Sequence, residues 1–174
     1  MAVTRVWGRL IKRSSIGDLR FISGTEPVED ACFNELFFNS NMKIRWTDAK
    51  LYYYYHHADS AINSHFGRGV LNAVKPLLDS LDQIKDADKR KRIISRCYKY
   101  VFSARYGEQY ADDYSDILKQ CNEWLKLLSE YRRELDLRER VVYCVMSRFP
   151  RLYRAWRIYD APTLKDFERA KRTK

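Results

Sequence analysis

The sequence predicts an all-α protein, with an extended basic N-terminal arm followed by a helical bundle of four or five main helices. Its 174 residues are 45% hydrophobic and 32% charged and include only 6 Gly and 4 Pro, which disfavours disorder and a turn-rich β-sandwich. Apolar residues recur at helical steps through most of the chain, and no segment shows a stronger strand pattern. A chain of this length fits one domain.

The chain is expected to divide into an arm, residues 1–46, and a helical bundle with a basic C-terminal segment, residues 47–174. Trp7 stands among the cations of the arm, and Asp18 is the only acid in residues 1–20. A cationic segment of this kind is suited to following a row of phosphates. We expect the arm to wrap nucleic acid through Arg5, Arg9, Lys12, Arg13 and Arg20.

The first helices of the chain are predicted from capping residues and apolar spacing. Pro27 at a first helical position predicts a short helix that ends near Phe38. Thr47 can cap a second helix over residues 48–65, where apolar residues follow the i, i+4, i+7 rule.

Three further helical patterns follow. Residues 70–84 carry a helical face in which Pro76 should kink or restart the helix, because proline lacks a backbone donor. Residues 93–104 predict a helix that ends near Gly107. The longest apolar pattern covers residues 110–128 and predicts the longest helix.

The C-terminal part of the chain predicts shorter helices. Asp136 and Glu139 form a D-x-x-E variant of the capping box, and Pro150 closes the helix that follows them or begins the next. Apolar spacing then predicts short helices at residues 152–159 and 163–167.

Four consecutive tyrosines lie in the helix expected over residues 48–65. Because consecutive helical residues point about 100° apart, one core face can accept only two of these rings. A fully buried ring is favourable by roughly 1.5–3 kcal/mol, so a contact between subunits is the expected setting. The expected subunit-interface residues are Trp7, Tyr52, Tyr53, Tyr54 and Tyr55. Base stacking on exposed rings is the alternative.

The charge balance points to a polyanionic partner. The chain has 33 Lys+Arg against 23 Asp+Glu, a net charge of +10, which suits nucleic acid, an anionic membrane or an acidic protein. Each basic row could be a solvated helix face, but together with the arm they favour phosphate contacts without sequence specificity. The two rows are Lys89, Arg92, Arg96 and Lys99, and Arg148, Arg151, Arg154 and Arg157.

Signatures of catalysis and of metal binding are missing from the sequence. It has no G-x-S-x-G, no Gly-rich phosphate loop and no C-x-x-C, and His56, His57 and His65 form no i, i+4 pair. We therefore expect no enzyme, no metal and no cofactor. The four cysteines are expected to be buried thiols.

Neither end of the chain suggests export. The first residues lack the unbroken apolar stretch of a signal peptide, and no apolar run approaches the roughly 20 residues that span a bilayer. We expect the protein to stay in a cytoplasm-like compartment.

The arm MAVTRVWGRLIKRSSIGDLR, followed by the tyrosine-rich bundle from Thr47 to about Tyr159, resembles in layout the major coat (capsid) proteins of filamentous archaeal viruses, the lipothrixvirus and rudivirus type. Those are small basic helical subunits whose N-terminal extension wraps double-stranded DNA while a helical bundle packs against neighbours. The resemblance implies a structural protein that packages double-stranded DNA, without sequence specificity, in a helical filamentous virion.

The same resemblance implies the partners and the location of the protein. The implied partners are double-stranded DNA and further copies of the chain, and the family also allows a second homologous coat subunit and a surrounding lipid envelope. The implied location is the virion, with the host cytoplasm as the place of assembly. Two alternatives remain: a small dimeric DNA-binding regulator, and a matrix-like protein that binds anionic membrane.

Overall fold

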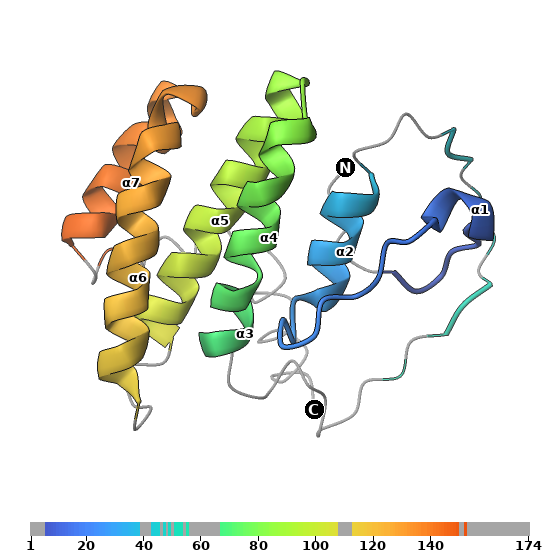
Figure 1. Ribbon diagram of the computed structural model, residues 1–174, viewed down its shortest axis with the longest axis horizontal. Helices are drawn as coiled ribbons and strands as arrows, with labels where there is room; N and C mark the ends of the chain where they lie inside the picture. The colour runs from blue at the N-terminus through green and yellow to red at the C-terminus, as the bar shows by residue number, and fades with distance from the viewer. Residues whose placement is uncertain are drawn as a thin grey trace, which may run out of the picture.

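The computed structural model describes residues 6–38, 43–45, 47, 49, 51–53, 55, 67–107, 113–149 and 152. In this part of the chain the fold is an all-α bundle, as predicted, and no strand is present there (Figure 1). The helices are α1 (Arg13–Ile16), α2 (Glu29–Phe37), α3 (Gly67–Asn72), α4 (Val74–Asp79), α5 (Ala87–Gly107), α6 (Tyr114–Leu128) and α7 (Leu137–Arg148). Short 3₁₀ turns, η2 (Ser80–Gln83) and η3 (Ser129–Glu134), follow α4 and α6.

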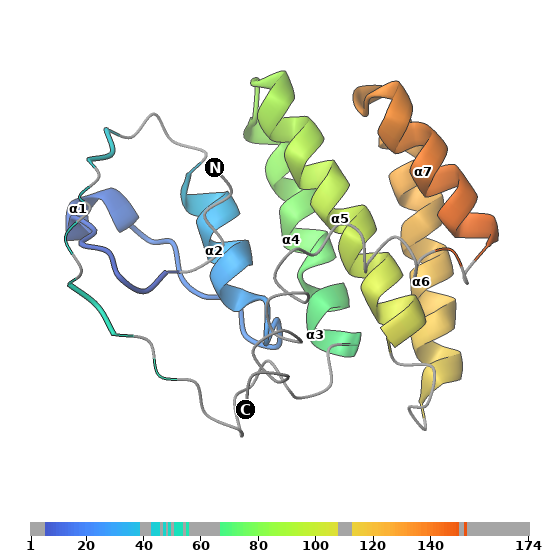
Figure 2. The ribbon, with the colours of Figure 1, turned by 180° about the vertical axis from the view of Figure 1, so that it is seen from behind.

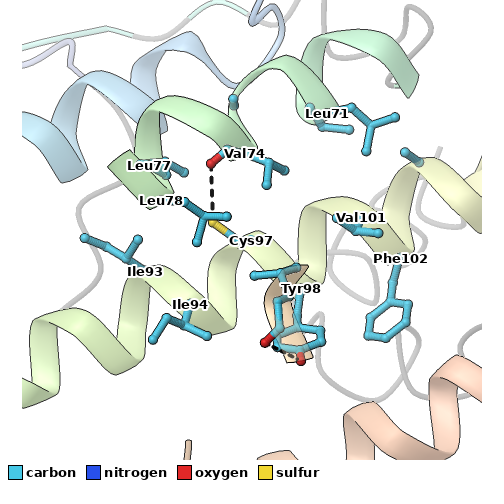
Figure 3. Packing of buried hydrophobic residues seen from close by; sticks show 14 of the residues in the cluster. Leu71, Val74, Leu77, Leu78, Ile93, Ile94, Cys97, Tyr98, Val101 and Phe102 are labelled. Atoms are coloured by element: carbon cyan, nitrogen blue, oxygen red, sulfur yellow. Dashed lines mark hydrogen bonds between the residues drawn. The ribbon is translucent and has the colours of Figure 1, made fainter. Parts of the chain in front are cut away.

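Helix α5 is the centre of the bundle and packs against α3, α4, α6 and α7 (Figure 2). Its apolar face is fully buried, and Figure 3 shows this face meeting side chains of α3 and α4. Because each fully buried aliphatic or aromatic side chain is worth roughly 1.5–3 kcal/mol, this contact fixes how the helices are arranged. The residues labelled there are Leu71, Val74, Leu77, Leu78, Ile93, Ile94, Cys97, Tyr98, Val101 and Phe102.

The predicted interruption near Pro76 is confirmed as a restart of the helix. Helix α3 ends at Asn72 and α4 begins at Val74. Proline cannot donate to the carbonyl four residues earlier, and its ring crowds that carbonyl, which here belongs to Asn72. The chain therefore breaks at Ala73, and the same buried face continues on both short helices.

Helix α2 confirms the short helix predicted from Pro27 and packs onto the bundle. It contacts α4, and its Cys32 belongs to the same buried cluster as the residues of α5. The expected arm thus contains a helix that contributes to the core of the bundle.

The helix expected over residues 48–65 is wrong for the part that the structure describes. Residues 49, 51–53 and 55 are not helical. The hydroxyl of Thr47 accepts a hydrogen bond from the backbone N–H of Ala49 (3.2 Å), and the N–H of Leu51 donates to the Ala49 carbonyl (3.0 Å). Local turns thus use groups that a helix would need, and aromatic side chains lose rotamer freedom in a helix. The rest of that range lies outside the described residues.

The prediction for residues 110–128 is confirmed as a helix but wrong in its length. Helix α6 has 15 residues and begins at Tyr114, whereas α5 has 21. Helix α5 starts before its first apolar position because Asp86 caps it: the Asp86 carboxylate accepts from the backbone N–H of Lys89 (2.7 Å). Apolar spacing cannot detect such a charged first turn.

The start of α7 confirms the predicted cap at Asp136. Its carboxylate accepts a hydrogen bond from the backbone N–H of Glu139 (2.8 Å). The Glu139 side chain does not complete the box, since its carboxylate accepts from the Ser95 hydroxyl (2.9 Å) of α5 instead. The helices predicted at residues 152–159 and 163–167 lie, except for Leu152, outside the described residues.

The described helices show no membrane-spanning character. None of them, within the ranges given above, combines the length and apolar content needed to cross a bilayer.

Candidate nucleic-acid interface

The part of the arm before α2, residues 6–28, contacts that helix on either side of α1, while α1 itself lies away from it (Figure 1). The backbone N–H of Val6 donates to the Asp30 carboxylate (3.3 Å). Further along, the ring of Phe21 stacks on that of Phe33, with centroids 4.5 Å apart. Polar and aromatic contacts with α2 therefore attach the arm to the bundle.

Arg9 is the most firmly held of the expected phosphate-binding residues that the structure describes. Its guanidinium donates to the side-chain oxygen of Asn34 (2.9 Å) and lies over the ring of Phe38, 5.6 Å from the centroid. Partial burial lowers the pKa of Arg9, and the charge of Asp30 opposes that effect. The side chain stays cationic, because an arginine pKa lies far above neutrality. The N–H group that donates to Asn34 can bind a phosphate only if Asn34 is displaced.

The other described cations of the arm lie at or near α1. Lys12 and Arg13 are exposed and have no ion pair or hydrogen bond to a described acid. Arg20 is also exposed, and one of its nitrogens donates to the carbonyls of Gly17 (2.9 Å) and Leu19 (2.8 Å). Its remaining N–H groups can still donate to a phosphate. Arg5 lies outside the described residues.

Two further cations at the α1 end of the molecule were not predicted from the sequence as binding residues. Lys43 and Arg45 are exposed, and the segment that carries them lies at the same end as α1, away from α6 and α7 (Figure 1). The sequence contained a usable signal, because these cations flank an apolar residue, as the cations before α1 do. That residue, Ile44, is 49% exposed.

The residues expected at a subunit interface lie partly against one another. The rings of Trp7 and Tyr52 stack with centroids 5.1 Å apart and an interplanar angle of 14°, which ties the arm to residues 51–53. Tyr53 and Tyr55 are 86% and 76% exposed, and Tyr54 lies outside the described residues. These exposed rings beside cations suit either a neighbouring subunit or a stacked base, so their role as an interface stays a prediction.

The basic row of α5 packs against α2. The Lys89 ammonium donates to the carbonyl of Phe38 (3.0 Å), and Arg96 pairs with Glu35 (2.8 Å). The Arg96 and Glu35 side chains are only 14% and 11% exposed, so this pair is largely removed from solvent. Arg92 lies 3.8 Å from the same carboxylate and is about half exposed. In the described structure these three residues hold α2 on the bundle, while Lys99 is exposed further along α5.

The second basic row is described only at its start. Arg148 is exposed at the end of α7, whereas Arg151, Arg154 and Arg157 lie outside the described residues. Its role stays a prediction.

The cysteines behave largely as expected. Cys32, Cys97 and Cys121 are buried, and burial raises the pKa of Cys32 to about 11 and that of Cys121 to about 12. These thiols are therefore neutral at physiological pH. Cys144 differs from the expectation, since it is only partly buried on α7. No cluster of three metal-binding side chains occurs in the described ranges, and the three histidines lie outside them.

Comparison with known proteins adds no relative: no family model, no curated protein and no solved structure matches the chain. The inference of a binding partner therefore rests on the charged and aromatic side chains at the surface of the chain.

Proposed function

We propose that this protein binds double-stranded DNA without sequence specificity and packages it as a structural subunit of a helical filament. One observation carries the proposal: exposed cations gather at the α1 end of the molecule without acidic partners in the described part of the chain. They are Lys12, Arg13, Lys43 and Arg45. Asp18 is an exposed acid near them. Such a surface attracts a phosphate backbone, and contacts to phosphates carry no direct sequence information.

The cations of the chain divide between two roles in this proposal. Arg96 and Lys89 hold α2, so DNA contact falls mainly to the α1 end. Arg20 is a further contact through its remaining N–H groups, and Arg9 is another once Asn34 exchanges for phosphate. A row of identical subunits on one DNA then acts by effective concentration, so a single subunit need not bind tightly. The resemblance to coat proteins of filamentous archaeal viruses makes a virion the expected setting.

Salt-dependent DNA binding tests which cations face the phosphates. For duplex DNA, log K falls with log salt concentration by about 0.9 for each phosphate neutralised. We expect a Lys12→Ala, Arg13→Ala double variant to bind unrelated duplexes more weakly by the same factor and to show a slope smaller by about 1.8.

A charge-matched control is available on α6. Lys119 and Lys126 are exposed and lie far from α1 (Figure 1). Their double alanine variant loses the same net charge and should keep the wild-type slope. Equal weakening in both variants would mean that the effect is net charge alone and would overturn the assignment of the α1 end.

Electron microscopy of the protein mixed with random-sequence DNA tests packaging itself. Regular filaments are expected. Discrete dimers bound at one preferred sequence would instead support the DNA-binding regulator and reject the packaging role.

A further inference from the structure

Helix α7 presents apolar side chains to solvent on the face opposite the core. Tyr143 and Met146 point into the bundle and are buried. Spaced four residues apart on the other side are Leu137 (75% exposed), Val141 (55%), Val145 (37%) and Phe149 (57%), and Leu152 (49%) follows three residues later. A helix that is apolar on two sides is typical of one that is covered on both. Leu152 lies beyond the end of α7, so the stripe consists of Leu137, Val141, Val145 and Phe149, and it has no cover in the described structure.

The exposed charges beside this stripe are positive, and the nearby acids of the described residues already pair with α5. Arg138 and Arg148 are exposed, and each stands three residues from a member of the stripe, Arg138 before Val141 and Arg148 after Val145. By contrast, the Asp136 carboxylate pairs with Lys91 (2.7 Å) and that of Glu134 with Arg90 (2.6 Å), both on α5. Whatever covers the stripe must therefore be apolar where it meets the side chains and negative around them.

A second copy of α7 does not meet this requirement. In an antiparallel pair of α7 helices that brings Val141 onto Val145 of the other copy, Leu137 meets Phe149 and Arg138 meets Arg148. The apolar residues would match, but arginine would face arginine on both sides of the contact, and like charges held together are destabilising.

We propose that the stripe of α7 docks on the surface of an anionic lipid bilayer. An interfacial helix lies in the membrane plane, with Leu, Val and Phe in the boundary region and Arg at the headgroups. Arginine suits this position, because its aliphatic stem packs with the apolar residues while the guanidinium reaches a lipid phosphate. Helix α7 is about 18 Å long and forms one side of the bundle, so a flat surface can meet its whole length (Figure 2).

The position of α7 separates this surface from the proposed DNA surface. Helices α1 and α7 lie at opposite ends of the long axis of the molecule (Figure 1). The two surfaces can therefore be occupied together, and the protein would connect a nucleic acid on one side with a membrane on the other. The lipid proposal does not depend on DNA binding at the α1 end, since the two surfaces share no residue. Arg148, which belongs to the second predicted basic row, is assigned here to lipid headgroups.

Vesicle flotation of the full chain tests the proposal. We expect binding to vesicles of phosphatidylcholine mixed with phosphatidylglycerol and little binding to phosphatidylcholine alone. A Leu137→Ser, Phe149→Ser double variant should bind the anionic vesicles about tenfold more weakly, because it removes two exposed apolar side chains from the stripe. The matched control is Leu10→Ser, Leu51→Ser, which removes two even more exposed side chains (105% and 81%) elsewhere and should bind as wild type.

A label gives a second readout that does not depend on affinity. An environment-sensitive fluorophore on Leu137→Cys, in a Cys144→Ser background, should shift to the blue with anionic vesicles, whereas the same label on Leu51→Cys should not. The proposal is overturned if the protein ignores anionic vesicles, if the stripe variant floats as well as wild type, or if both serine variants lose binding equally. It is also overturned if light scattering shows a dimer that the stripe variant alone dissociates, since a second copy would then cover the stripe.

Discussion

In the sequence, Arg96 fits two roles, an exposed phosphate contact and an internal ion pair. Only its neighbours in the fold distinguish between them. Its spacing from Lys89, Arg92 and Lys99 is that of a cationic helix face. In the fold, the guanidinium meets Glu35 of α2 at 2.8 Å, and both side chains are largely buried. A buried charge of this kind is bound to its partner, and removing one member leaves the other unpaired in a poorly solvated place.

We therefore expect Glu35→Ala to lower the free energy of unfolding by about 3 kcal/mol or more. A Glu35→Leu, Arg96→Leu double variant should lose less than the sum of its single changes, since neither charge is left alone. Urea unfolding at neutral pH measures these differences. The exposed pair of Lys75 and Asp79 provides the control: its side chains are 70% and 61% exposed, and Lys75→Ala should change stability by about 0.5 kcal/mol or less. A similar small effect at Glu35 would contradict a structural role for the pair.

Asp136 makes stability depend on pH at the acid end. Its hydrogen bond from Lys91 (2.7 Å), together with the capping bond from the backbone of Glu139, holds the pKa of Asp136 below its ordinary value. Because the pKa is lower in the folded state than the value of about 3.9 in an unfolded chain, the stabilisation is complete above that value. It is lost as the pH falls through the folded pKa.

The expected result is that acidification below about pH 4 lowers the urea midpoint of the wild type more steeply than that of Asp136→Asn. Asparagine keeps a capping oxygen but does not titrate, and Asp136→Ala should be less stable than Asp136→Asn at neutral pH. Parallel acid profiles for wild type and Asp136→Asn would assign the pH dependence to other carboxylates.

Between elements, Gly69 near the start of α3 packs closely against the backbone of the segment before α2. A Cβ atom built on this residue would overlap the backbone carbonyl of Glu26, in the segment that leads into α2. Only glycine allows these two backbones to pack at this separation.

Gly69→Ala should therefore move the segment before α2 away from α3 and lower the free energy of unfolding by more than about 2 kcal/mol. Thermal unfolding followed by circular dichroism measures this change. Gly17→Ala is the comparison: no atom lies within 4 Å of its added Cβ, although its φ of +57° carries a cost of about 1 kcal/mol. Gly17→Ala tests a strained backbone φ, whereas Gly69→Ala tests a close backbone contact. A smaller loss of stability at Gly69 than at Gly17 would mean that the segment before α2 moves away from α3 at little cost.

Elements with a strong local signal were predictable from the sequence, and those held by distant contacts were not. Helix α5 follows from its apolar spacing, and α7 follows from its cap at Asp136. The non-helical conformation of residues 51–53 could not be predicted, because these residues also satisfy helical spacing. The stacking partner of Tyr52 is Trp7, which lies far from it in the sequence. The docking of α2 depends in the same way on the pairing of Glu35 with Arg96.

The candidate interface was predictable only in part, for the same physical reason. Lys12 and Arg13 were identified from the charge of the arm and are exposed. Arg9 and Arg96 were identified by the same reasoning, yet each has an acceptor on α2, which no local pattern reveals. Lys43 and Arg45 were overlooked although they flank an apolar residue as the cations before α1 do; the fold shows that their segment lies at the same end as α1.

For the molecule as a whole, the bundle should fold without the first 20 residues. The buried cluster and the side chains packed on it include no described residue before Ile22. We expect a chain lacking residues 1–20 to keep a cooperative thermal transition by circular dichroism while it loses the ability to condense DNA. Phe102→Ala, in the centre of the core, should instead cost about 3–5 kcal/mol. Loss of cooperative unfolding on truncation would show that the arm is part of the folding unit.

Asn34 is an uncharged acceptor for a charged group, and that choice affects how the N-terminal segment can change partners. A neutral amide oxygen holds a guanidinium less strongly than a phosphate does, because it lacks the opposite charge. A single passing phosphate gains little by competing, but a dense linear array offers many at once. In the proposed packaging role, the segment would stay folded back on α2 in the free protein and transfer to a polymer when one arrives, with no chemical trigger required.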